Sequence, residues 1–294
     1  MRRLKKLQFK ATKDYPILYL LPAITVLILL VGAPLVQNVI RSFTVKGVFP
    51  TVGNYQKLFA DKYFQRDIRN TFTWLLYTVS MEMIFGLTLA VLLNLKIRGQ
   101  KIFRTIFIIP WVIPAVVVCI IWKWIYNVDY GILNHILRTL HIVDAMQAFV
   151  ADPKQVLFCI AVVYVWKIAP FVMIMYLSGL QSISADIYEA ATLDGASGLT
   201  QVFKITIPLL FPVMRSVLLV SMIWSLNSFV YVYAISRGGP ARVSELVQIF
   251  IYKTGIEQFK FEYSAAAANT FFLIVMAIAF VYNVFTEKHE ANLM

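Results

Sequence analysis

The sequence is poor in charged residues and in the residue types that carry covalent or metal chemistry. Only 14% of its 294 residues are Asp, Glu, Lys or Arg, whereas about 25% are charged in a typical soluble domain. Cys119 and Cys159 both fall in apolar segments and indicate neither a disulfide nor a metal cluster. The three histidines show no metal-ligand spacing, and without a Gly-Lys dipeptide the chain has no Walker A loop for ATP.

Hydrophobic residues are abundant instead. They make up 60% of the chain, which indicates an integral membrane protein. The formal net charge of +12 could also suggest a nucleic-acid-binding protein. However, the basic residues are divided among short loops and form no stripe beside a soluble fold, so we expect no nucleic-acid partner. We expect some of them to meet anionic lipid headgroups.

Six apolar segments are long enough to cross a bilayer, which requires about 20 residues. The first follows basic residues as a signal peptide would, but its long apolar run lacks a small-residue cleavage site, so we expect it to be retained. Five prolines in or near the segments predict kinks: Pro22, Pro34, Pro110, Pro114 and Pro170. The sequence predicts an all-α membrane protein with spans at 17–39, 71–95, 103–125, 156–180, 207–230 and 265–286.

The charges of the connecting segments predict how the spans are oriented. Residues 1–16 are basic, with Asp14 as their one acid, and loop 96–104 is basic without any acid. By the positive-inside rule both lie in the cytoplasm. The predicted cytoplasmic segments are 1–16, 96–104, 181–206 and 287–294, and the external ones are 40–70, 126–155 and 231–264. The external loops are too short for independent domains, so residues 17–286 are expected to form one integral domain of the inner or plasma membrane.

Residues 181–206 are polar and helix-forming, although apolar spans precede and follow them. Ser184 is placed to cap a helix whose first turns carry carboxylates, including Glu189, where the helix dipole favours negative charge. Gly195 can adopt the left-handed conformation that ends such a helix. A second helix would start near Leu199. Because a simple linker needs no pair of helices, the pattern favours a docking element for a partner protein.

This hairpin resembles the EAA motif of permease subunits in binding-protein-dependent ABC importers. The matching residues are Glu189, Ala190, Ala191, Asp194, Gly195, Ala196, Phe203, Ile205, Pro208 and Pro212. Further similar fragments are Asn54-Tyr55, Asn70-Thr71, residues 110–114, residues 130–134, Trp166-Lys167 and residues 238–241. The resemblance extends over nearly the whole chain and is greatest to the maltose-like and glycerol-phosphate-like sugar branch.

The resemblance implies a six-span type I importer permease that is not an enzyme and holds no cofactor itself. The implied contacts with an ATPase are made by Glu189, Ala190, Ala191, Asp194 and Gly195. The implied partners are two ATPase subunits that bind ATP and Mg²⁺, a related permease in a heterodimer, an extracytoplasmic solute-binding protein and membrane lipid. The implied function is ATP-driven import of a sugar or oligosaccharide, neutral or anionic, into the cytoplasm.

Two ionisable residues fall in the middle of predicted spans, Glu82 in the second and Lys167 in the fourth. An unpaired charge there costs about 2.5–3.5 kcal/mol on insertion scales. One interpretation is a structural pair between Glu82 and Lys167, or separate hydrogen bonds within the bundle. The other interpretation places Lys167 in the substrate path, where it would hold a hydroxyl or anionic group. We favour a position of Lys167 near the path and leave the pair open.

Polar and aromatic residues share one broad face of the fifth predicted span. Helix packing through serines is one explanation, and interfacial anchoring is another for Trp224 and Tyr231. A sugar, however, binds to flat aromatic faces and paired polar groups. In the resembled sugar importers, the spans beside the coupling loop line the cavity. We therefore predict a substrate path lined by Tyr164, Lys167, Phe171, Ser221, Trp224, Asn227, Ser228 and Tyr231, with Asn269 as a weaker candidate.

Two functions of other classes match parts of the sequence. An ion-coupled secondary transporter would use carboxylates at the membrane midplane, where Glu82 is the one candidate. A rhomboid-like intramembrane protease would use the serine of residues 195–198, which read Gly-Ala-Ser-Gly. That serine, Ser197, falls in a polar loop and needs a base within reach, while no histidine falls in a predicted span. We keep both functions as alternatives to the importer.

Overall fold

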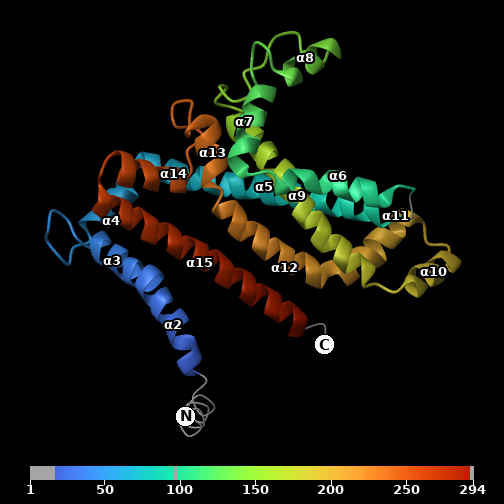
Figure 1. Cartoon of the computed structure of the whole chain (residues 1–294), viewed down its shortest axis with the longest axis horizontal. Helices are drawn as coiled ribbons and strands as arrows, with labels where there is room; N and C mark the ends of the chain where they lie inside the picture. Colours follow the sequence, from blue (N-terminus) through green and yellow to red (C-terminus); the bar gives the residue numbers. More distant parts are fainter. Residues whose placement is uncertain (1–16, 96–97, 292–294) are drawn as a thin grey trace, which may run out of the picture. The chain divides into compact units, whose positions relative to one another are not determined.

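The computed structural model describes residues 17–95 and 98–291 (Figure 1). Within these ranges all regular secondary structure is helical, apart from an isolated bridge between Val45 and Val48. This confirms the all-α fold. The predicted cytoplasmic N-terminus, residues 1–16, and residues 292–294 lie outside the described residues. The elements, with η marking π-helical segments, are α2 (Ile17–Leu27), η1 (Ile28–Gly32), α3 (Ala33–Ser42), α4 (Gly53–Ala60), α5 (Lys62–Asn94), α6 (Gln100–Val112), α7 (Ala115–Ile125), α8 (Ile132–Thr139), α9 (Val156–Gln181), α10 (Ala185–Leu193), α11 (Gly198–Gln201), η2 (Val202–Thr206), α12 (Ile207–Leu226), α13 (Phe229–Ser236), α14 (Val247–Tyr252), η3 (Lys253–Glu257) and α15 (Phe261–Ala291).

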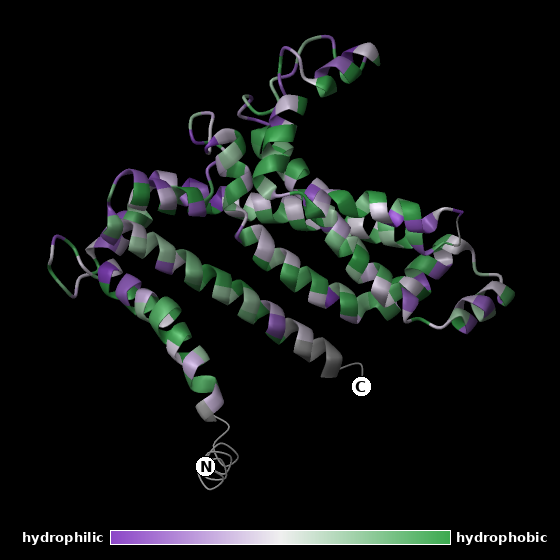
Figure 2. Cartoon of the chain, viewed as in Figure 1, coloured by the Kyte–Doolittle hydropathy of each residue, from purple (hydrophilic) through white to green (hydrophobic). Residues whose placement is uncertain are grey.

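Five helices are long and apolar enough to cross a membrane, and they correspond to five of the six predicted spans. Hydrophobic residues run along them, whereas hydrophilic residues gather in the connecting segments (Figure 2). The five are Tyr19–Ser42, Lys62–Asn94, Val156–Gln181, Gly198–Leu226 and Phe261–Val284. Lys62–Asn94 begins well before the predicted start at residue 71. The first turns of α5 are polar, so their composition did not indicate that they belong to a span.

The third predicted span, 103–125, is not one straight helix. It consists of α6 and α7, which meet at a bend of 99° around Ile113 and Pro114. Figure 1 shows α7 leaving the line of α6 at this point. At 1.5 Å per residue the two helices measure about 20 Å and 16 Å, so neither alone crosses an apolar core of about 30 Å. Proline disfavours helical backbone at the residue before it, which explains why the break falls at Ile113.

The fifth predicted span, 207–230, lies several residues earlier in the structure than predicted. Its helix already begins at Gly198 and continues through η2 and α12 to Leu226. It then ends at Asn227 and Ser228, and α13 follows as a separate short helix. Pro208 and Pro212 do not interrupt it, because Pro208 lies in the first turn of α12 and Pro212 is accommodated inside the helix.

The chain divides into two compact units. The first comprises Met1–Asp61 and Ile251–Phe271, and in its described part polar side chains join separate helices. Asn38 on α3 donates a hydrogen bond of 2.8 Å to Asn269 on α15. Tyr263 donates to the carboxylate of Asp61 at 3.0 Å. Asn269, the weaker pathway candidate, therefore has a structural partner within this unit.

The second unit comprises Lys62–Phe250 and Phe272–Met294 and contains both predicted functional regions. Its centre is α9, which packs against α5, α6 and α12. Small residues allow these close approaches. A Cβ added to Gly86 on α5 would lie 2.4 Å from a Val172 methyl on α9, and one added to Gly179 on α9 would lie 2.5 Å from Leu210 on α12. Such small-residue contacts are typical of helix packing in membranes.

Candidate functional site

The hairpin after α9 begins with a capped helix, as the sequence predicted. Ser184 is the N-cap of α10, and its hydroxyl accepts a hydrogen bond from the backbone N–H of Asp186. At the other end, Gly195 has φ +79°. The Gly195 N–H donates to the Thr192 carbonyl at 3.0 Å, and the Ala196 N–H donates to the Ala191 carbonyl at 2.9 Å. These two bonds form a Schellman C-cap, which confirms the left-handed glycine.

The hairpin is joined rigidly to the fifth span. The hydroxyls of Tyr188 on α10 and Thr206 on η2 share a hydrogen bond of 3.0 Å. Gln201 donates to the Thr192 hydroxyl at 3.0 Å and to the Ala196 carbonyl at 3.1 Å. Because α11 and η2 continue directly into α12, these hydrogen bonds join α10 to the first part of the fifth span. The predicted second helix near Leu199 is thus the first part of the fifth span.

The hairpin formed by α10, α11 and η2 exposes large apolar side chains. A segment that only connects two spans has no need of them. Leu193 is 90% exposed, Leu199 73% and Phe203 66%. Glu189 and Asp194 are also exposed, and Ala191 is buried. Figure 1 shows α10 and α11 at the end of the second unit where α9 stops and α12 begins. The hairpin therefore presents an apolar surface with carboxylates beside it, as a protein-docking element requires.

Ser197 serves as a helix cap in this structure. It is the N-cap of α11, where its hydroxyl accepts from the Thr200 N–H at 3.3 Å and shares a hydrogen bond with the Thr200 hydroxyl at 2.9 Å. These short-range bonds account for Ser197 without a catalytic base. The geometry thus gives no support to the protease alternative.

Lys167 joins α9 to the break between α6 and α7. Its ammonium group donates hydrogen bonds of 2.7 Å to the backbone carbonyls of Trp111 and Ile113. The last carbonyls of a helix have no partner within that helix, and they carry the negative end of its dipole. A cation at this point therefore satisfies the carbonyls that the bend leaves open. Lys167 is 8% exposed, so its charge is largely held inside the chain.

The possible pair between Glu82 and Lys167 is not formed, because Lys167 donates to carbonyls instead. Glu82 is fully buried, and neither of its carboxylate oxygens takes a hydrogen bond from the described residues. The Ser221 hydroxyl on α12 lies close to this carboxylate, but the two do not meet hydrogen-bond geometry. One turn away from Glu82, Thr78 shares a hydrogen bond of 2.5 Å with Ser225 on α12. Glu82 thus belongs to a polar seam between α5 and α12.

Three helices bring aromatic rings together next to Lys167. The rings of Phe171 on α9 and Trp224 on α12 lie 4.6 Å apart, and those of Phe171 and Trp111 on α6 lie 5.8 Å apart. Trp111 and Trp224 are 38% and 37% exposed, and Asn227 beyond Trp224 is exposed as well. We call Trp111, Phe171 and Trp224 the aromatic face. It offers flat rings to a ligand beside a buried cation.

The other four predicted pathway residues are buried and do not belong to the aromatic face, so their place in a substrate path stays a prediction. Tyr164 and Tyr231 are 2% and 6% exposed, and their rings pack edge to face at 4.9 Å. Ser221 and Ser228 are 0% and 3% exposed. The helical period places Tyr164 only one turn from Lys167, but α13 covers that part of α9. The helical period shows that Tyr164 and Lys167 are close on α9, but it does not show that α13 packs over Tyr164.

The sequence analysis missed Trp111 as a member of the aromatic face. Trp111 lies between Pro110 and Pro114, and those prolines were interpreted as kinks within one span. Instead the break exposes Trp111 at the end of α6 and brings it to α9. The available signal was an aromatic residue, Trp111, within one helical turn before the helix-breaking Pro114.

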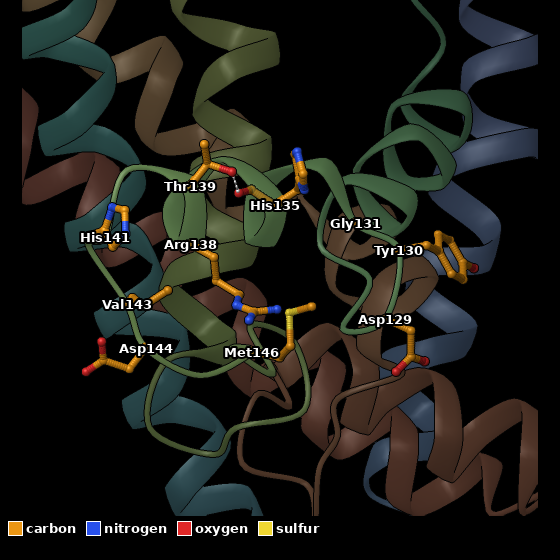
Figure 3. Close-up of a pocket in the computed structure, with 10 residues that line it drawn as sticks. All are labelled: Asp129, Tyr130, Gly131, His135, Arg138, Thr139, His141, Val143, Asp144 and Met146. Atoms are coloured by element: carbon orange, nitrogen blue, oxygen red, sulfur yellow. Dashed lines mark hydrogen bonds between the residues drawn. The ribbon is translucent and has the colours of Figure 1, made fainter.

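A cavity of about 650 Å³ lies in the predicted external loop 126–155, around α8 (Figure 3). Asn134 holds the loop by donating to the carbonyls of Asn127 and Gln147 and accepting from the Gln147 N–H. Histidine, arginine and aspartate side chains line the cavity, but in Figure 3 they point in different directions. Among the described residues, no group of three or more His, Cys, Asp or Glu is arranged to hold a metal ion.

Comparison with known protein families decides what these features belong to. The family of binding-protein-dependent transport system inner membrane components matches residues 82–291. The chain belongs to this family. Members are permeases and not enzymes, which confirms the predicted class and the location in the inner membrane. The matched region includes the hairpin, the aromatic face and the break between α6 and α7.

Relatives within this family are similar along almost their full length. A probable ABC transporter permease protein of Pyrococcus horikoshii is 32% identical, covering 94% of this chain and 97% of the relative. The trehalose/maltose transport system permease protein MalF of Thermococcus litoralis is 30% identical, covering 94% and 95%. The sulfoquinovosyl glycerol transport system permease protein SmoG of Agrobacterium fabrum is 30% identical, covering 90% and 88%.

The fold is also that of a solved permease. A chain of a bacterial ABC transporter involved in import of the acidic polysaccharide alginate superposes with a TM-score of 0.85. That comparison covers 96% of this chain and 98% of the other, at 22% identity, and it shows the shared importer fold. The prediction of an importer permease is therefore confirmed for family and fold.

Proposed function

We propose that the chain is one permease subunit of an ATP-driven importer that carries a sugar or oligosaccharide into the cytoplasm. The observation that supports this most directly is the continuous helix from Gly198 to Leu226. This helix begins in the exposed hairpin and carries Trp224 of the aromatic face near its other end. Two of the three relatives are named as permeases for trehalose/maltose and for sulfoquinovosyl glycerol, which supports a sugar. Family membership favours this function over an ion-coupled secondary transporter or a protease.

The partners follow from what this chain lacks and what it exposes. Without a Walker A loop it needs separate ATPase subunits, of which we expect two, each binding ATP and Mg²⁺. We expect their docking surface to be the hairpin at Glu189, Ala190, Ala191, Asp194 and Gly195. A second, related permease would complete a heterodimer, and an extracytoplasmic solute-binding protein would deliver the substrate. In this arrangement both termini lie in the cytoplasm.

The aromatic face is the proposed substrate contact of this subunit. Trp111, Phe171 and Trp224 give apolar ring surface for the C–H faces of a sugar. The Lys167 ammonium has three N–H donors, of which the two carbonyls take two, and no described carboxylate pairs with it. The remaining positive charge favours an anionic sugar over a neutral one. The import of acidic alginate by the superposable transporter agrees with this preference.

Transport requires that ATPase movement changes access to the aromatic face. When the ATPases close on ATP, they would displace α10, and its bonds to α11 and η2 would carry the displacement into α12. Trp224 lies near the far end of that helix, against Phe171 of the central helix α9. A shift of α12 relative to α9 would therefore open or close the aromatic face. This is a bistable packing change of the kind that couples distant sites.

Changing the hairpin should uncouple the chain from its ATPase. We expect Glu189→Lys or Gly195→Pro to lower ATPase co-purification from native membranes and sugar-stimulated ATP hydrolysis at least about tenfold. Proline cannot adopt φ +79° and would remove the N–H that bonds to Thr192. Asp144→Lys, a charge reversal on the exposed loop around α8, is the matched control and should retain the ATPase. If both hairpin variants retain a fully stimulated ATPase, the coupling proposal is wrong.

Removing one ring of the aromatic face should impair transport without affecting assembly. We expect Trp224→Ala to reduce uptake at least about fivefold, because a stacked ring contributes roughly 1 kcal/mol beyond its buried area. ATPase co-purification should stay unchanged. Trp124→Ala removes a tryptophan that is 66% exposed on α7 and serves as the control. Equal uptake by the two variants would place the substrate path elsewhere. Uptake should be assayed with neutral and uronic oligosaccharides to test the charge preference.

A further inference from the structure

A cavity lies between the ends of α6 and α9 that the positive-inside rule assigns to the cytoplasm. Its volume is about 270 Å³. Arg104 lies one turn after the start of α6, and Gln181 is the last residue of α9. The cavity therefore opens where the polar interface of the membrane would lie. It is lined by Arg104, Ile108, Met173, Ile174, Leu177, Ser178 and Gln181.

The lining changes from polar to apolar along the direction of the spans. Arg104, Ser178 and Gln181 are the lining residues nearest the helix ends. Ile108 is one turn further along α6, and Ile174 and Met173 lie one to two turns further back along α9. No aromatic or polar residue lines this deeper part. A phospholipid has the same polarity profile, with a charged headgroup at the interface and acyl chains below it.

Arg104 keeps hydrogen-bonding capacity that the described residues do not use. One terminal nitrogen donates to the Leu93 carbonyl at 3.2 Å, near the end of α5. Its Nε is buried without a hydrogen-bond partner among the described side chains and backbone. No described Asp or Glu forms an ion pair with it, and no lining residue is acidic. A planar guanidinium with free donors is well suited to a phosphate.

We propose that this cavity binds the phosphate headgroup of an anionic phospholipid of the cytoplasmic leaflet, with Arg104 as the phosphate ligand. Ser178 and Gln181 would supply further donors to the headgroup, while Ile108 and Ile174 contact an acyl chain. Arg98, just before α6, and Lys101, in its first turn, are exposed and add positive potential that attracts anionic lipid. The proposal rests on the predicted orientation and not on the identity of the transported substrate.

The transported sugar fits this cavity less well than a lipid does. A sugar presents hydroxyls on most sides, and burying these without hydrogen-bond partners is unfavourable. The deeper lining offers it neither donors nor ring surfaces. The aromatic face, with Trp111 and Phe171, begins only further along α6 and α9. The two sites are therefore distinguished by their chemistry.

Lipid binding can be measured by native mass spectrometry of the purified permease complex with added phosphatidylglycerol or phosphatidylcholine. We expect the unmodified chain to retain phosphatidylglycerol at least about tenfold more tightly than phosphatidylcholine. Arg104→Gln should abolish this preference, while Lys154→Gln, which changes an exposed lysine of the predicted external loop 126–155, should retain it. Ser178→Leu leaves Arg104 and its bond to Leu93 intact but fills the cavity opening, and should also abolish it.

Three results would overturn the proposal. The first is equal binding of the two lipids by the unmodified chain. The second is an unchanged preference in both Arg104→Gln and Ser178→Leu. The third is displacement of phosphatidylglycerol by an anionic oligosaccharide, which would make the cavity part of the substrate path. Because the measurement needs no transport, it remains informative even if the proposed sugar importer function is wrong.

Discussion

Replacing Arg242 with leucine should destabilise the chain by about 3–5 kcal/mol, because it leaves two buried carboxylates without their main cation. The Arg242 guanidinium donates to both oxygens of Glu245, at 3.0 Å and 2.7 Å, and lies 3.7 Å from Asp67. The side chains of Asp67 and Glu245 are fully buried. The same guanidinium stacks 4.1 Å from the centre of the Tyr63 ring.

Beside the cluster around Arg242, further hydrogen bonds hold the segment between α13 and α14 against α5. Asn70 on α5 donates hydrogen bonds of 2.9 Å to the carbonyls of Val243 and Glu245. We therefore expect the loss of Arg242 to loosen the whole segment between α13 and α14, and not a single side chain.

Denaturant unfolding in mixed micelles measures the effect of Arg242→Leu. Arg69→Leu, which changes an exposed arginine on α5, is the control and should cost less than about 1 kcal/mol. Adding Asp67→Asn and Glu245→Gln to Arg242→Leu should recover part of the loss, since the remaining groups are then neutral. Equal stability of Arg242→Leu and Arg69→Leu would show that the cluster does not stabilise the fold.

Replacing Lys167 with methionine should destabilise the chain by about 3 kcal/mol or more. The substitution removes the donor of two hydrogen bonds to the carbonyls of Trp111 and Ile113. Hydrogen bonds to charged groups contribute about 1.5–3 kcal/mol each. We also expect the bend between α6 and α7 to relax, which would disorder Trp111 and lower sugar uptake. Lys123→Met, an exposed lysine on α7, is the control.

A double substitution tests whether Glu82 contributes to the role of Lys167. Because the two side chains do not pair, the effects of Glu82→Gln and Lys167→Met on the free energy of unfolding should add to within about 0.5 kcal/mol. Restored stability in the double variant would instead show that they interact, and the helix-break explanation of Lys167 would then be wrong.

The family-like fragments in the sequence prove to be anchors of irregular backbone. Asn54 donates to the carbonyls of Ser42 and Thr44, Asn70 to those of Val243 and Glu245, and Asn134 to those of Asn127 and Gln147. One asparagine side chain can satisfy several backbone groups at once, which suits it to these three non-helical segments. The motif revealed that these positions matter, but only the contacts show what each one holds.

The length and apolarity of the segments determined five of the spans, and local cap chemistry determined the hairpin. A span must satisfy its own backbone hydrogen bonds, so its helical nature follows from composition alone. Ser184 and Gly195 act within a few residues of themselves, and their roles could therefore be inferred from the sequence. The EAA resemblance added the family, which the comparisons confirmed.

Only the tertiary structure decided how the helices share their faces. The bend of 99° between α6 and α7, the use of Lys167 to close it, and the burial of Tyr164 and Tyr231 all depend on helices distant in sequence. A helical period shows which residues share a face, but not which neighbouring helix covers that face. In a membrane, where nearly every helix surface is apolar, hydrophobicity does not distinguish a protein contact from a lipid contact. For that reason the sequence determined five of the spans and the capped hairpin, and packing decided which of the candidate residues form the aromatic face.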